Sequence, residues 1–239
     1  IAINLEHVGE FDSPANEIIA TLSGIDSRDF GISDPDRILK NSLGGKTKGE
    51  KGEVFKGDQD EVRFESAKYK PDLVADFSTK IRTDVCYLYQ TRATTKVCLK
   101  KKASDRDSTD FCQVNNDNVV VDNSGAPVQI KDITEKSAGT NEVQFTFVVE
   151  NKGTGKVYPK DTFSTECSRK EDKEDKLEIE VRTGSGRHPV KCSQLSSSNK
   201  GEMRLRSDKQ SHMRCRSSTS SAPDNAIEEP INIIVNYFY

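Results

Sequence analysis

Alternating apolar and polar positions are the clearest signal along the chain, and they predict β-strands. From Phe77 to Tyr89 every second residue is apolar or threonine, a period of two that is typical of a half-buried strand. A second alternating run, Thr91 to Lys100, follows directly, and we interpret the two runs as a long hairpin. Similar short patterns predict further strands at residues 1–5, 18–22, 62–64, 119–121, 128–133, 143–149, 177–181, 203–205 and 231–239.

One short helix is expected among these strands. Asp34 is a typical N-cap residue, Pro35 suits the first helical position, and Gly44 with Gly45 would end the segment. The Lys, Gly and Glu residues of 44–53 cannot bury surface, so that stretch is interpreted as a loop. Because no crossover helix is expected between the other strands, the pattern predicts an all-β fold.

A polar stretch separates the strand pattern into two parts. Residues 103–125 are rich in Asn, Asp and Ser, which favour turns. We therefore predict two tandem immunoglobulin-like β-sandwich domains, residues 1–102 and 126–239, joined by this junction and stabilised by disulfides.

Composition supports strands around a thin core. Ile and Val together outnumber Leu by more than three to one, and β-branched residues suit a pleated surface better than a helix. Apolar types make up 33% of the residues and charged types 31%. No apolar run of about 18 residues occurs, so the chain as written predicts no membrane-spanning helix. Because the chain begins at Ile1 rather than Met, we expect that an N-terminal segment preceded it, and a signal peptide or an anchor is a candidate for that segment.

The charge of the chain is nearly balanced, which bears on its partners. The formal net charge is −3, and no Arg/Lys cluster is interleaved with aromatic residues, so no nucleic-acid partner is expected. The stretch from Gly44 to Thr47 matches the last residues of the phosphate-binding-loop motif. That motif also needs Gly at position 40, which is Lys in this chain. No cofactor is therefore predicted.

Six cysteines indicate the expected compartment. They stand at wide spacings with no Cys-x-x-Cys pair, unlike zinc ribbons and thioredoxin-like redox motifs. Disulfides are the favoured use, and they imply an oxidising location that is extracellular or at the cell surface. The alternative is a set of free or buried thiols in a cytosolic protein. The six residues are Cys86, Cys98, Cys112, Cys167, Cys192 and Cys215.

Several segments carry a resemblance to known proteins. They are the cysteine-bounded run 86–98, the junction Ser124-Gly-Ala-Pro-Val128, the run 143–155 and the terminal Tyr-Phe-Tyr. Together with the order of the six cysteines, they resemble a group of uncharacterised archaeal proteins of the DPANN type, over about residues 75–239. Proteins of that group are secreted or membrane-anchored and have no assigned activity, so the resemblance implies a location and a fold.

A second resemblance concerns the later part of the chain. The run 148–155 is similar to the strand and turn of CARDB-type adhesion modules, which are immunoglobulin-like sandwiches. This resemblance implies a CARDB-like fold for residues 126–239. The stretch 203–210 lacks the glycine-rich turn that the archaeal group usually has there, which leaves the local hairpin geometry open.

The disulfide pairing is a hypothesis, since six cysteines allow fifteen connectivities. We favour two local bonds, because each closes a short loop, and the remaining two cysteines then pair across the two halves. The three pairs are Cys98–Cys112, Cys192–Cys215 and Cys86–Cys167.

The sequence contains no recognised catalytic motif. It has no Gly-x-Ser-x-Gly and no His-Glu-x-x-His, and its three histidines, His7, His188 and His212, are interpreted as surface residues. The protein is therefore expected not to be an enzyme, and a secreted hydrolase is the less favoured alternative.

A calcium site is a weak further candidate. Asn116, Asp117 and Asp122 place oxygen ligands at the predicted junction, where an ion would stiffen the linker. Their spacing is not that of an EF-hand, and clusters of Asn and Asp usually form turns. We therefore predict no metal.

The sequence favours a non-catalytic extracellular structural or cell-surface protein, whose partners are copies of itself or other surface proteins. Apolar strands at both ends of the chain suggest assembly into a filament or layer, by adding a strand to a neighbour's sheet edge. An adhesion or ligand-binding module anchored to the cell surface is the alternative. The assembly-strand candidates are Ile1, Ile3, Leu5, Ile231, Ile233 and Val235.

Overall fold

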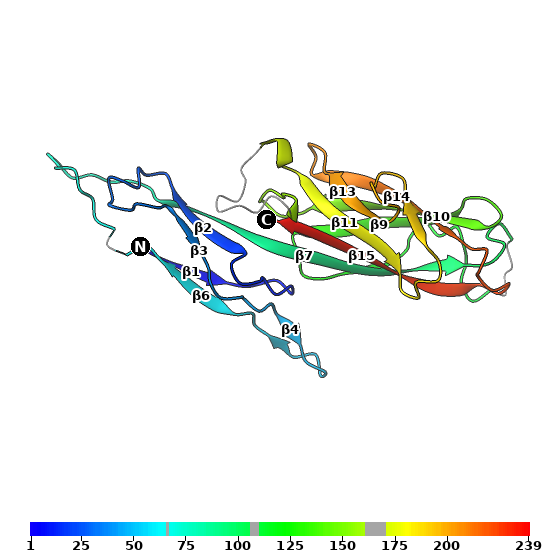
Figure 1. Ribbon diagram of the computed structural model, residues 1–239. Helices are drawn as coiled ribbons and strands as arrows, with labels where there is room; N and C mark the ends of the chain where they lie inside the picture. The colour runs from blue at the N-terminus through cyan, green and yellow to red at the C-terminus, as the bar shows by residue number, and fades with distance from the viewer. Residues whose placement is uncertain (66, 106–109, 161–170) are drawn as a thin grey trace. The chain divides into compact units, whose positions relative to one another are not determined.

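Strands account for nearly all of the regular structure (Figure 1). The computed structural model describes residues 1–65, 67–105, 110–160 and 171–239. Within those residues there is no α-helix, and a 3₁₀ turn, η2, spans Glu171–Lys173. The strands pair antiparallel, so the all-β prediction is confirmed. The immunoglobulin-like assignment of each domain stays a prediction.

The described residues form two compact units. Unit 1 contains Ile1–Tyr89, Glu171, Asp172 and Phe238–Tyr239, and unit 2 contains Gln90–Lys160 and Lys173–Tyr237. The described residues of the predicted junction, 103–125, belong to unit 2. The boundary between the units therefore differs from the predicted one.

Strand β7, Arg82–Leu99, explains this difference. It is a single strand of 18 residues, so the predicted hairpin is wrong. Residues 90–92 are Gln, Thr and Arg, which include none of the turn formers Gly, Pro, Asn and Asp. Buried side chains recur at every second position from Tyr89 to Val97, so the alternation passes through these residues without a break. The chain leaves unit 1 and enters unit 2 within one strand.

Unit 1 is built from short strands. β2 lies between β3 and the first part of β7, β1 pairs with β6, and β4 forms a hairpin with β5. The strands are β1 (Ala2–Glu6), β2 (Ile18–Ser23), β3 (Asp36–Ile38), β4 (Thr47–Lys48), β5 (Val54–Phe55) and β6 (Gln59–Arg63). The core of the unit contains Ile18, Ala20, Leu22, Ile32, Leu39, Leu43, Val62 and Phe64.

The helix predicted after Asp34 is wrong, because this segment forms β3. The Asp34 side chain accepts the N–H of Asp36 at 2.9 Å, which makes a turn. The carbonyl of Pro35 accepts the N–H of Leu22 at 2.9 Å, which draws the following residues alongside β2. Pairing with a neighbouring strand overrides the local helix signal.

Unit 2 contains two antiparallel sheets around one core. One sheet has the order β12–β14–β10–β9, and the other has β13–β11–β15–β7 with β8 also paired to β7. Alternate residues of β10, β11, β14 and β15 are buried, so both sheets contribute to the core. The remaining strands are β8 (Val121–Asn123), β9 (Val128–Ser137), β10 (Glu142–Asn151), β11 (Lys176–Thr183), β12 (Val190–Cys192), β13 (Lys200–Arg204), β14 (Gln210–Ser218) and β15 (Ile227–Phe238).

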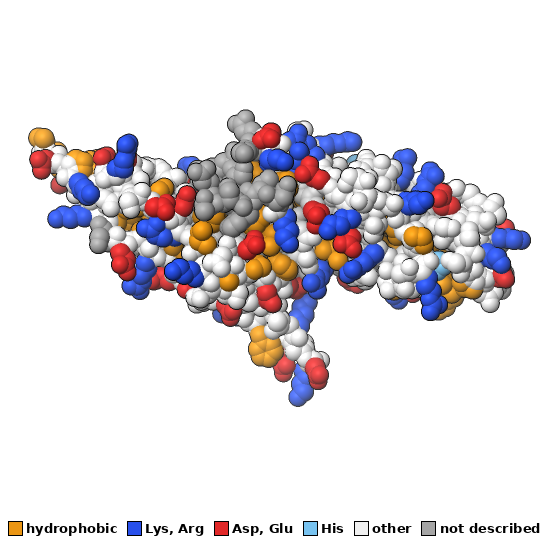
Figure 2. All heavy atoms as spheres, in the orientation of Figure 1, with side chains coloured by type: hydrophobic (Ala, Val, Ile, Leu, Met, Phe, Trp, Pro, Cys, Tyr) orange, Lys and Arg blue, Asp and Glu red, His pale blue; other side chains and the backbone are white. Residues whose placement is uncertain are grey.

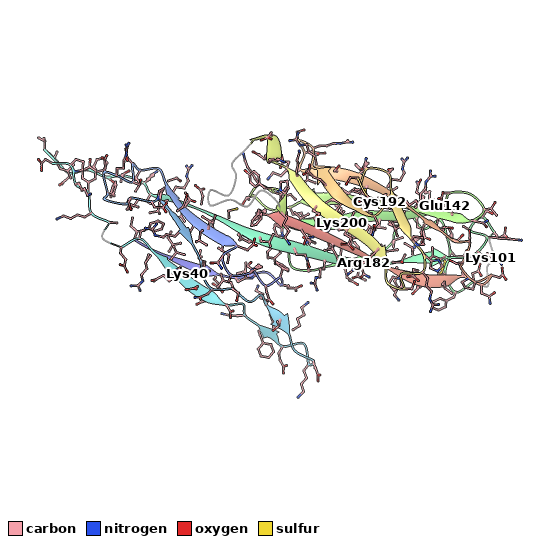
Figure 3. All side chains as sticks on the ribbon, viewed as in Figure 1. Lys40, Lys101, Glu142, Arg182, Cys192 and Lys200 are labelled. Atoms are coloured by element: carbon pink, nitrogen blue, oxygen red, sulfur yellow. A yellow bond between two sulfur atoms is a disulfide. The ribbon has the colours of Figure 1, made fainter. Side chains whose placement is uncertain are left out.

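The exposed strand faces of unit 2 carry charges of both signs. Glu178 on β11 lies 3.3 Å from Lys200 on β13, and Glu180 lies 3.7 Å from Arg182. Lys200 and Arg182 are labelled in Figure 3, and Figure 2 shows basic and acidic side chains intermixed over the face in view. Exposed pairs of this kind contribute roughly 0.2–1 kcal/mol each. We interpret this face as solvated surface.

Candidate functional site

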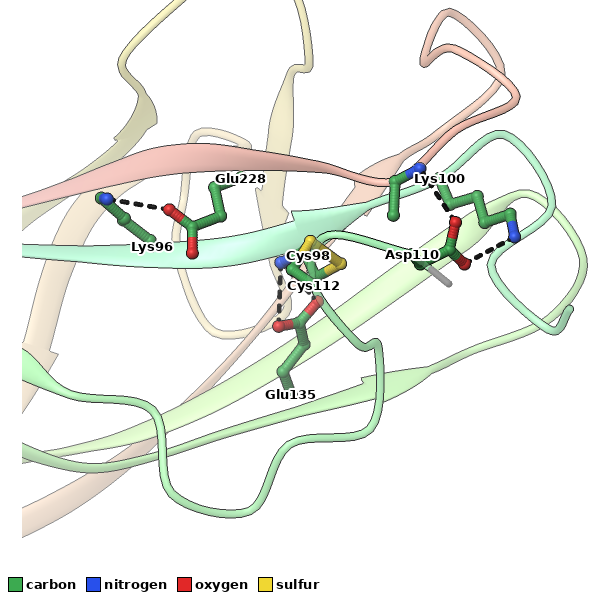
Figure 4. Close-up of a disulfide and its surroundings, with 8 residues drawn as sticks. Lys96, Cys98, Lys100, Asp110, Cys112, Glu135 and Glu228 are labelled. Atoms are coloured by element: carbon green, nitrogen blue, oxygen red, sulfur yellow. Dashed lines mark hydrogen bonds and ion pairs between the residues drawn. A yellow bond between two sulfur atoms is a disulfide. The ribbon is translucent and has the colours of Figure 1, made fainter. Parts of the chain in front are cut away.

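A cavity of about 390 Å³ in unit 2 brings a disulfide and a buried carboxyl together. Cys98 lies near the end of β7, and Cys112 lies in the segment between β7 and β8. Figure 4 shows the Glu135 carboxyl beside Cys98. The lining of the cavity includes Lys96, Cys98, Phe111, Cys112, Glu135 and Glu228.

A β-bulge places Glu135 on the buried face of β9. Buried positions on this strand are even-numbered up to Ile130 and odd-numbered from Ile133. The register between β9 and β10 shifts at this point, and Asp132 has a φ of 52° in the left-handed region. The extra residue changes the face on which every later side chain lies. An uninterrupted alternation would turn Glu135 towards solvent.

Glu135 is 2% exposed, and one backbone group holds its carboxyl. The N–H of Cys98 donates to both oxygens, Oε1 at 2.9 Å and Oε2 at 3.0 Å. No second donor to this carboxyl is found in the described part of the chain. Burial raises the pKa of Glu135 to about 8, and the Cys98 hydrogen bond offsets this shift only in part. Glu135 is therefore mainly protonated at neutral pH.

Two ion pairs flank the disulfide (Figure 4). Lys96 Nζ lies 2.8 Å from Glu228 Oε2, and both of these side chains reach solvent. Lys100 Nζ lies 2.6 Å from Asp110 Oδ2, and both of these side chains are largely buried. Each cation has its own acidic partner, which leaves burial as the main influence on the pKa of Glu135.

A protonated carboxyl beside a sulfur atom can donate a proton to a thiolate formed there. An ordinary cysteine thiol has a pKa of about 8.5, which is close to the value of about 8 for Glu135. Such a match favours proton transfer in either direction. Cys112 is partly exposed, whereas Cys98 is buried, so a small molecule has access to the Cys112 side of the bond.

Two of the predicted disulfides are present. Cys98–Cys112 has a sequence separation of 14 residues, and Cys192–Cys215 has one of 23. The second bond joins directly opposite residues of β12 and β14, and both of its cysteines are buried. The predicted pair Cys86–Cys167 stays a prediction, because Cys167 lies outside the described residues.

His7 is buried, which corrects its predicted place on the surface. Its Nε2 lies 3.1 Å from the hydroxyl oxygen of the buried Ser13, and its Nδ1 accepts the N–H of Gly9 at 3.2 Å. Because Nδ1 is an acceptor, the neutral ring carries its proton on Nε2 and donates to Ser13. Burial lowers the pKa of His7, which favours that neutral ring. We interpret this Ser–His contact as structural.

His188 is also buried, whereas His212 is exposed as predicted. The Nδ1 of His188 lies 3.3 Å from the hydroxyl oxygen of Ser221. A catalytic triad needs a carboxylate at the other ring nitrogen, and within the described ranges none is bonded there. No sequence motif links the residues of either Ser–His contact, so the sequence did not reveal them.

The three calcium candidates have other roles. Asp117 forms an ion pair with Lys136 at 3.2 Å, and Asn116 Oδ1 accepts the N–H of Asn118 at 2.9 Å. Asp122 lies on β8, opposite a residue of β7. Among the residues that the structure describes, no group of three or more His, Cys, Asp or Glu could hold a metal ion. The contacts around Asn116 are those of a turn.

The predicted C-terminal assembly strand is wrong. β15 lies between β11 and β7, and its candidates Ile231, Ile233 and Val235 are buried. A strand with neighbours on both edges has no backbone groups left to pair with a second molecule. β15 is therefore a central strand of unit 2.

The predicted N-terminal assembly strand has one neighbour. β1 belongs to a two-stranded sheet with β6, so within the described residues no strand pairs with its other edge. Ile3 and Leu5 pack against the core of unit 1, and Ile1 is exposed. β1 therefore stays a candidate edge for strand addition.

The segment from Pro71 to Ile81 is exposed, and its residues 77–81 carry the predicted strand pattern without a strand partner in the described chain. A strand is predicted from Phe77, whereas β7 begins at Arg82. Every residue of the segment is exposed, including the apolar Leu73 and Val74. The period of two is visible in the sequence, but the missing partner is a property of the fold.

No helix in the described ranges is long and apolar enough to cross a membrane. No known protein family matches the chain, and no curated protein matches it. Among solved structures, the crystal structure of envelope protein VP37 from White Spot Syndrome Virus is similar to this chain. The match covers 63% of this chain and 98% of that chain, with 10% sequence identity and a TM-score of 0.30. Similarity at this level establishes neither a shared fold nor a shared function.

Proposed function

We propose that this protein is a non-catalytic structural protein of the cell exterior. The observation that carries this proposal is the presence of two disulfides within unit 2. Disulfides persist in oxidising compartments and are rare in the cytosol. The resemblance to secreted archaeal proteins predicts the same location. Within the described residues, neither Ser–His contact has a carboxylate bonded to the histidine, and this arrangement agrees with the proposal.

The partners we propose are further copies of the chain or other surface proteins, bound by strand addition. The segment from Pro71 to Ile81 supports this, because it exposes apolar side chains and its part from Phe77 onward has the alternation of a strand. A strand from a second molecule would supply backbone hydrogen bonds and cover Leu73 and Phe77. In this proposal the segment replaces β15 as the assembly element.

The proposed location is tested by labelling thiols in protein that is freshly isolated from its natural source and then denatured. We expect no label on Cys192 or Cys215, because an oxidising compartment keeps this buried pair bonded. Labelling of both residues without added reductant would show a reducing compartment and contradict the proposal.

The proposed assembly is tested with two matched double variants. Leu73→Ser with Phe77→Ser changes the segment, and Val54→Ser with Phe55→Ser changes the β4–β5 hairpin as a control. Phe77 and Phe55 are 53% and 58% exposed, but Phe77 also stacks on Tyr69, so circular dichroism must first show that both variants are folded. We expect light scattering and electron microscopy to show assemblies of the wild type and the control, but not of the segment variant. A wild type that stays monomeric at high concentration would rule out self-assembly.

An adhesion or ligand-binding module is the second candidate, and the β4–β5 hairpin favours it. Val54 and Phe55 are exposed on a hairpin of two-residue strands, which is too small to bury them itself. Exposed apolar groups of this kind occur at protein-binding surfaces. If the hairpin variant loses association and the segment variant keeps it, the second candidate is the better one.

A further inference from the structure

The two described disulfides lie in different surroundings. Cys192–Cys215 is buried between neighbouring strands, and neither cysteine lines the cavity. Cys98–Cys112 lines the cavity with both of its cysteines, and Cys112 is partly exposed. Glu135 lies beside Cys98, whose backbone N–H donates to both oxygens of its carboxyl (Figure 4). Only one of the two bonds therefore combines access for a small molecule with a nearby acid.

We propose that Cys98–Cys112 is a site of thiol–disulfide exchange with external thiols, and that Glu135 protonates the Cys98 thiolate that leaves. Cys112 provides the sulfur that is attacked, because it is the accessible member of the pair. Cys98 provides the leaving sulfur, because it is buried beside the acid. The substrates are small thiols that fit a cavity of about 390 Å³.

The exchange runs in two steps. The thiolate of an external thiol attacks Cys112 Sγ, which forms a mixed disulfide and breaks the bond to Cys98 Sγ. The electron pair of the broken bond goes to Cys98 Sγ, and Glu135 transfers its carboxyl proton to that sulfur. A second external thiolate then attacks the external sulfur of the mixed disulfide and releases Cys112 as a thiolate, which takes a proton from water. Two external thiols are oxidised to one disulfide, the protein disulfide is reduced to two thiols, and Glu135 regains its proton from water.

Glu135 suits this role by its position and its surroundings. Its carboxyl is tied to the backbone of the residue whose sulfur needs the proton. Among the described residues, two ion pairs flank the site, Lys96 with Glu228 and Lys100 with Asp110. Neither pair adds a net charge that would hold Glu135 in its ionised form. Its pKa of about 8 keeps the proton available near neutral pH.

The proposal is tested on the full oxidised chain with glutathione as the external thiol. The reaction is quenched by alkylation at intervals, and peptide mapping by mass spectrometry shows which bond has opened. We expect Cys98–Cys112 to open at least about tenfold faster than Cys192–Cys215, with glutathione trapped first on Cys112. Equal rates for the two bonds, or glutathione trapped first on Cys98, would overturn the proposal. This comparison needs no variant, so a folding defect cannot obscure it.

Variants test the role of Glu135. Glu135→Gln keeps the shape and removes the acid, and we expect it to slow opening of Cys98–Cys112 by roughly tenfold or more at pH 7. The matched control, Glu180→Gln, changes a carboxyl of unit 2 outside the cavity and should leave the rate unchanged. Glu135→Asp restores an acid with a shorter reach and should recover part of the rate. Circular dichroism confirms that each variant is folded.

The pH profile separates proton donation from a structural role. In the wild type, the rate per external thiolate should fall as the pH rises through about 8, because Glu135 loses its proton. In Glu135→Gln the rate per external thiolate should stay constant as the pH rises through about 8. Identical profiles for the two proteins would show that Glu135 does not supply the proton.

Discussion

At the residue scale, one extra position on β9 determines the chemistry of the cavity. The bulge at Asp132 turns Glu135 inward, where the Cys98 N–H is its donor. Moving a carboxylate from water to a buried site costs more free energy than one hydrogen bond restores. The group therefore keeps its proton. A residue type that usually carries charge therefore serves as a neutral acid. A buried carboxyl of this kind makes the stability of unit 2 depend on pH.

Glu135 should make the protein less stable as the pH rises. Its pKa is about 8 in the folded chain against 4.5 ordinarily, so between these values only the unfolded state ionises. The folded state then binds more protons, and the free energy of unfolding falls by about 1.4 kcal/mol per pH unit at most. This contribution is complete below about pH 4.5 and is lost by about pH 8. Urea unfolding at pH 5, 6.5 and 8 measures it.

Glu135→Gln is the variant that checks this slope. We expect its stability relative to the wild type to increase from pH 5 to pH 8, because glutamine does not ionise. Glu180→Gln, at a partly exposed position outside the cavity, should follow the wild type. A constant difference between Glu135→Gln and the wild type over this range would show that the carboxyl is not protonated in the folded chain.

Gly9 is a second residue whose identity is required by a close contact. A Cβ at this position would collide with the Tyr89 side chain. The Tyr89 hydroxyl oxygen accepts the N–H of Glu10 at 2.9 Å and that of Phe11 at 3.4 Å. An added methyl group would displace the ring and leave both N–H groups without this acceptor.

Gly9→Ala should therefore destabilise unit 1 by roughly 1 kcal/mol or more, since it removes two hydrogen bonds, each worth roughly 0.5–1.5 kcal/mol. Tyr89→Phe removes the same two hydrogen bonds without displacing the ring, and we expect a smaller loss. Chemical denaturation of both variants, followed by tyrosine fluorescence, measures the difference. An alanine variant as stable as the wild type would show that Tyr89 can move at no cost.

At the scale of elements, the alternation of β7 and the position of β15 shape unit 2. The pattern of β7 runs through Gln90 without a turn former, which makes one strand where two are predicted. β15 has neighbours on both edges, so its apolar residues belong to the core. Because consecutive side chains on a strand point to opposite faces, neighbouring positions on β15 should differ in their contribution to stability.

Two isoleucines of β15 provide a matched test. Ile233 is 1% exposed and faces the core, whereas Ile234 is half-buried on the opposite face. Ile233→Ala should cost roughly 2–5 kcal/mol through lost burial and the cavity that remains. Ile234→Ala should cost roughly half as much or less, because less of its surface is buried. Equal losses in thermal or urea unfolding would contradict the central position of β15.

At the scale of the whole molecule, long strands and disulfides are distributed unevenly along the chain. The two sheets of unit 2 hold long strands and two disulfides, and unit 1 is made of short strands. Between β6 and β7, the segment from Pro71 to Ile81 is exposed throughout. A protease needs an extended backbone that is free of strand pairing, so this segment should be the first place that is cut.

Limited proteolysis with trypsin tests this expectation. Lys80 lies in the exposed segment, and Lys96 has an exposed side chain but lies within β7. We expect cleavage after Lys80 well before cleavage after Lys96, because a paired strand cannot enter the protease active site without local unfolding. In concentrated samples that assemble as proposed, cleavage after Lys80 should slow. Early cleavage after Lys96 would show that β7 is not stably paired.

Local sequence patterns predicted the fold class and two of the disulfides. The period of two and the excess of β-branched residues indicated an all-β chain, because both are properties of neighbouring residues along a strand. The pairs Cys98–Cys112 and Cys192–Cys215 could be favoured for a similar reason, since a short loop brings its own ends together. The cysteines of the candidate site were therefore visible in advance, and Glu135 was not.

The pairing of strands in the fold decided the position of Glu135 and the roles of β3 and β15. No glycine marks the bulge at Asp132, so the side of the sheet to which Glu135 turns depends on how β9 pairs with β10. The segment after Asp34 became β3 because β2 offered it hydrogen bonds, and β15 became central because two strands flank it. Periodicity shows that a strand forms, but the choice of its neighbours is a long-range property, and that choice determines whether a given residue is core, edge or site.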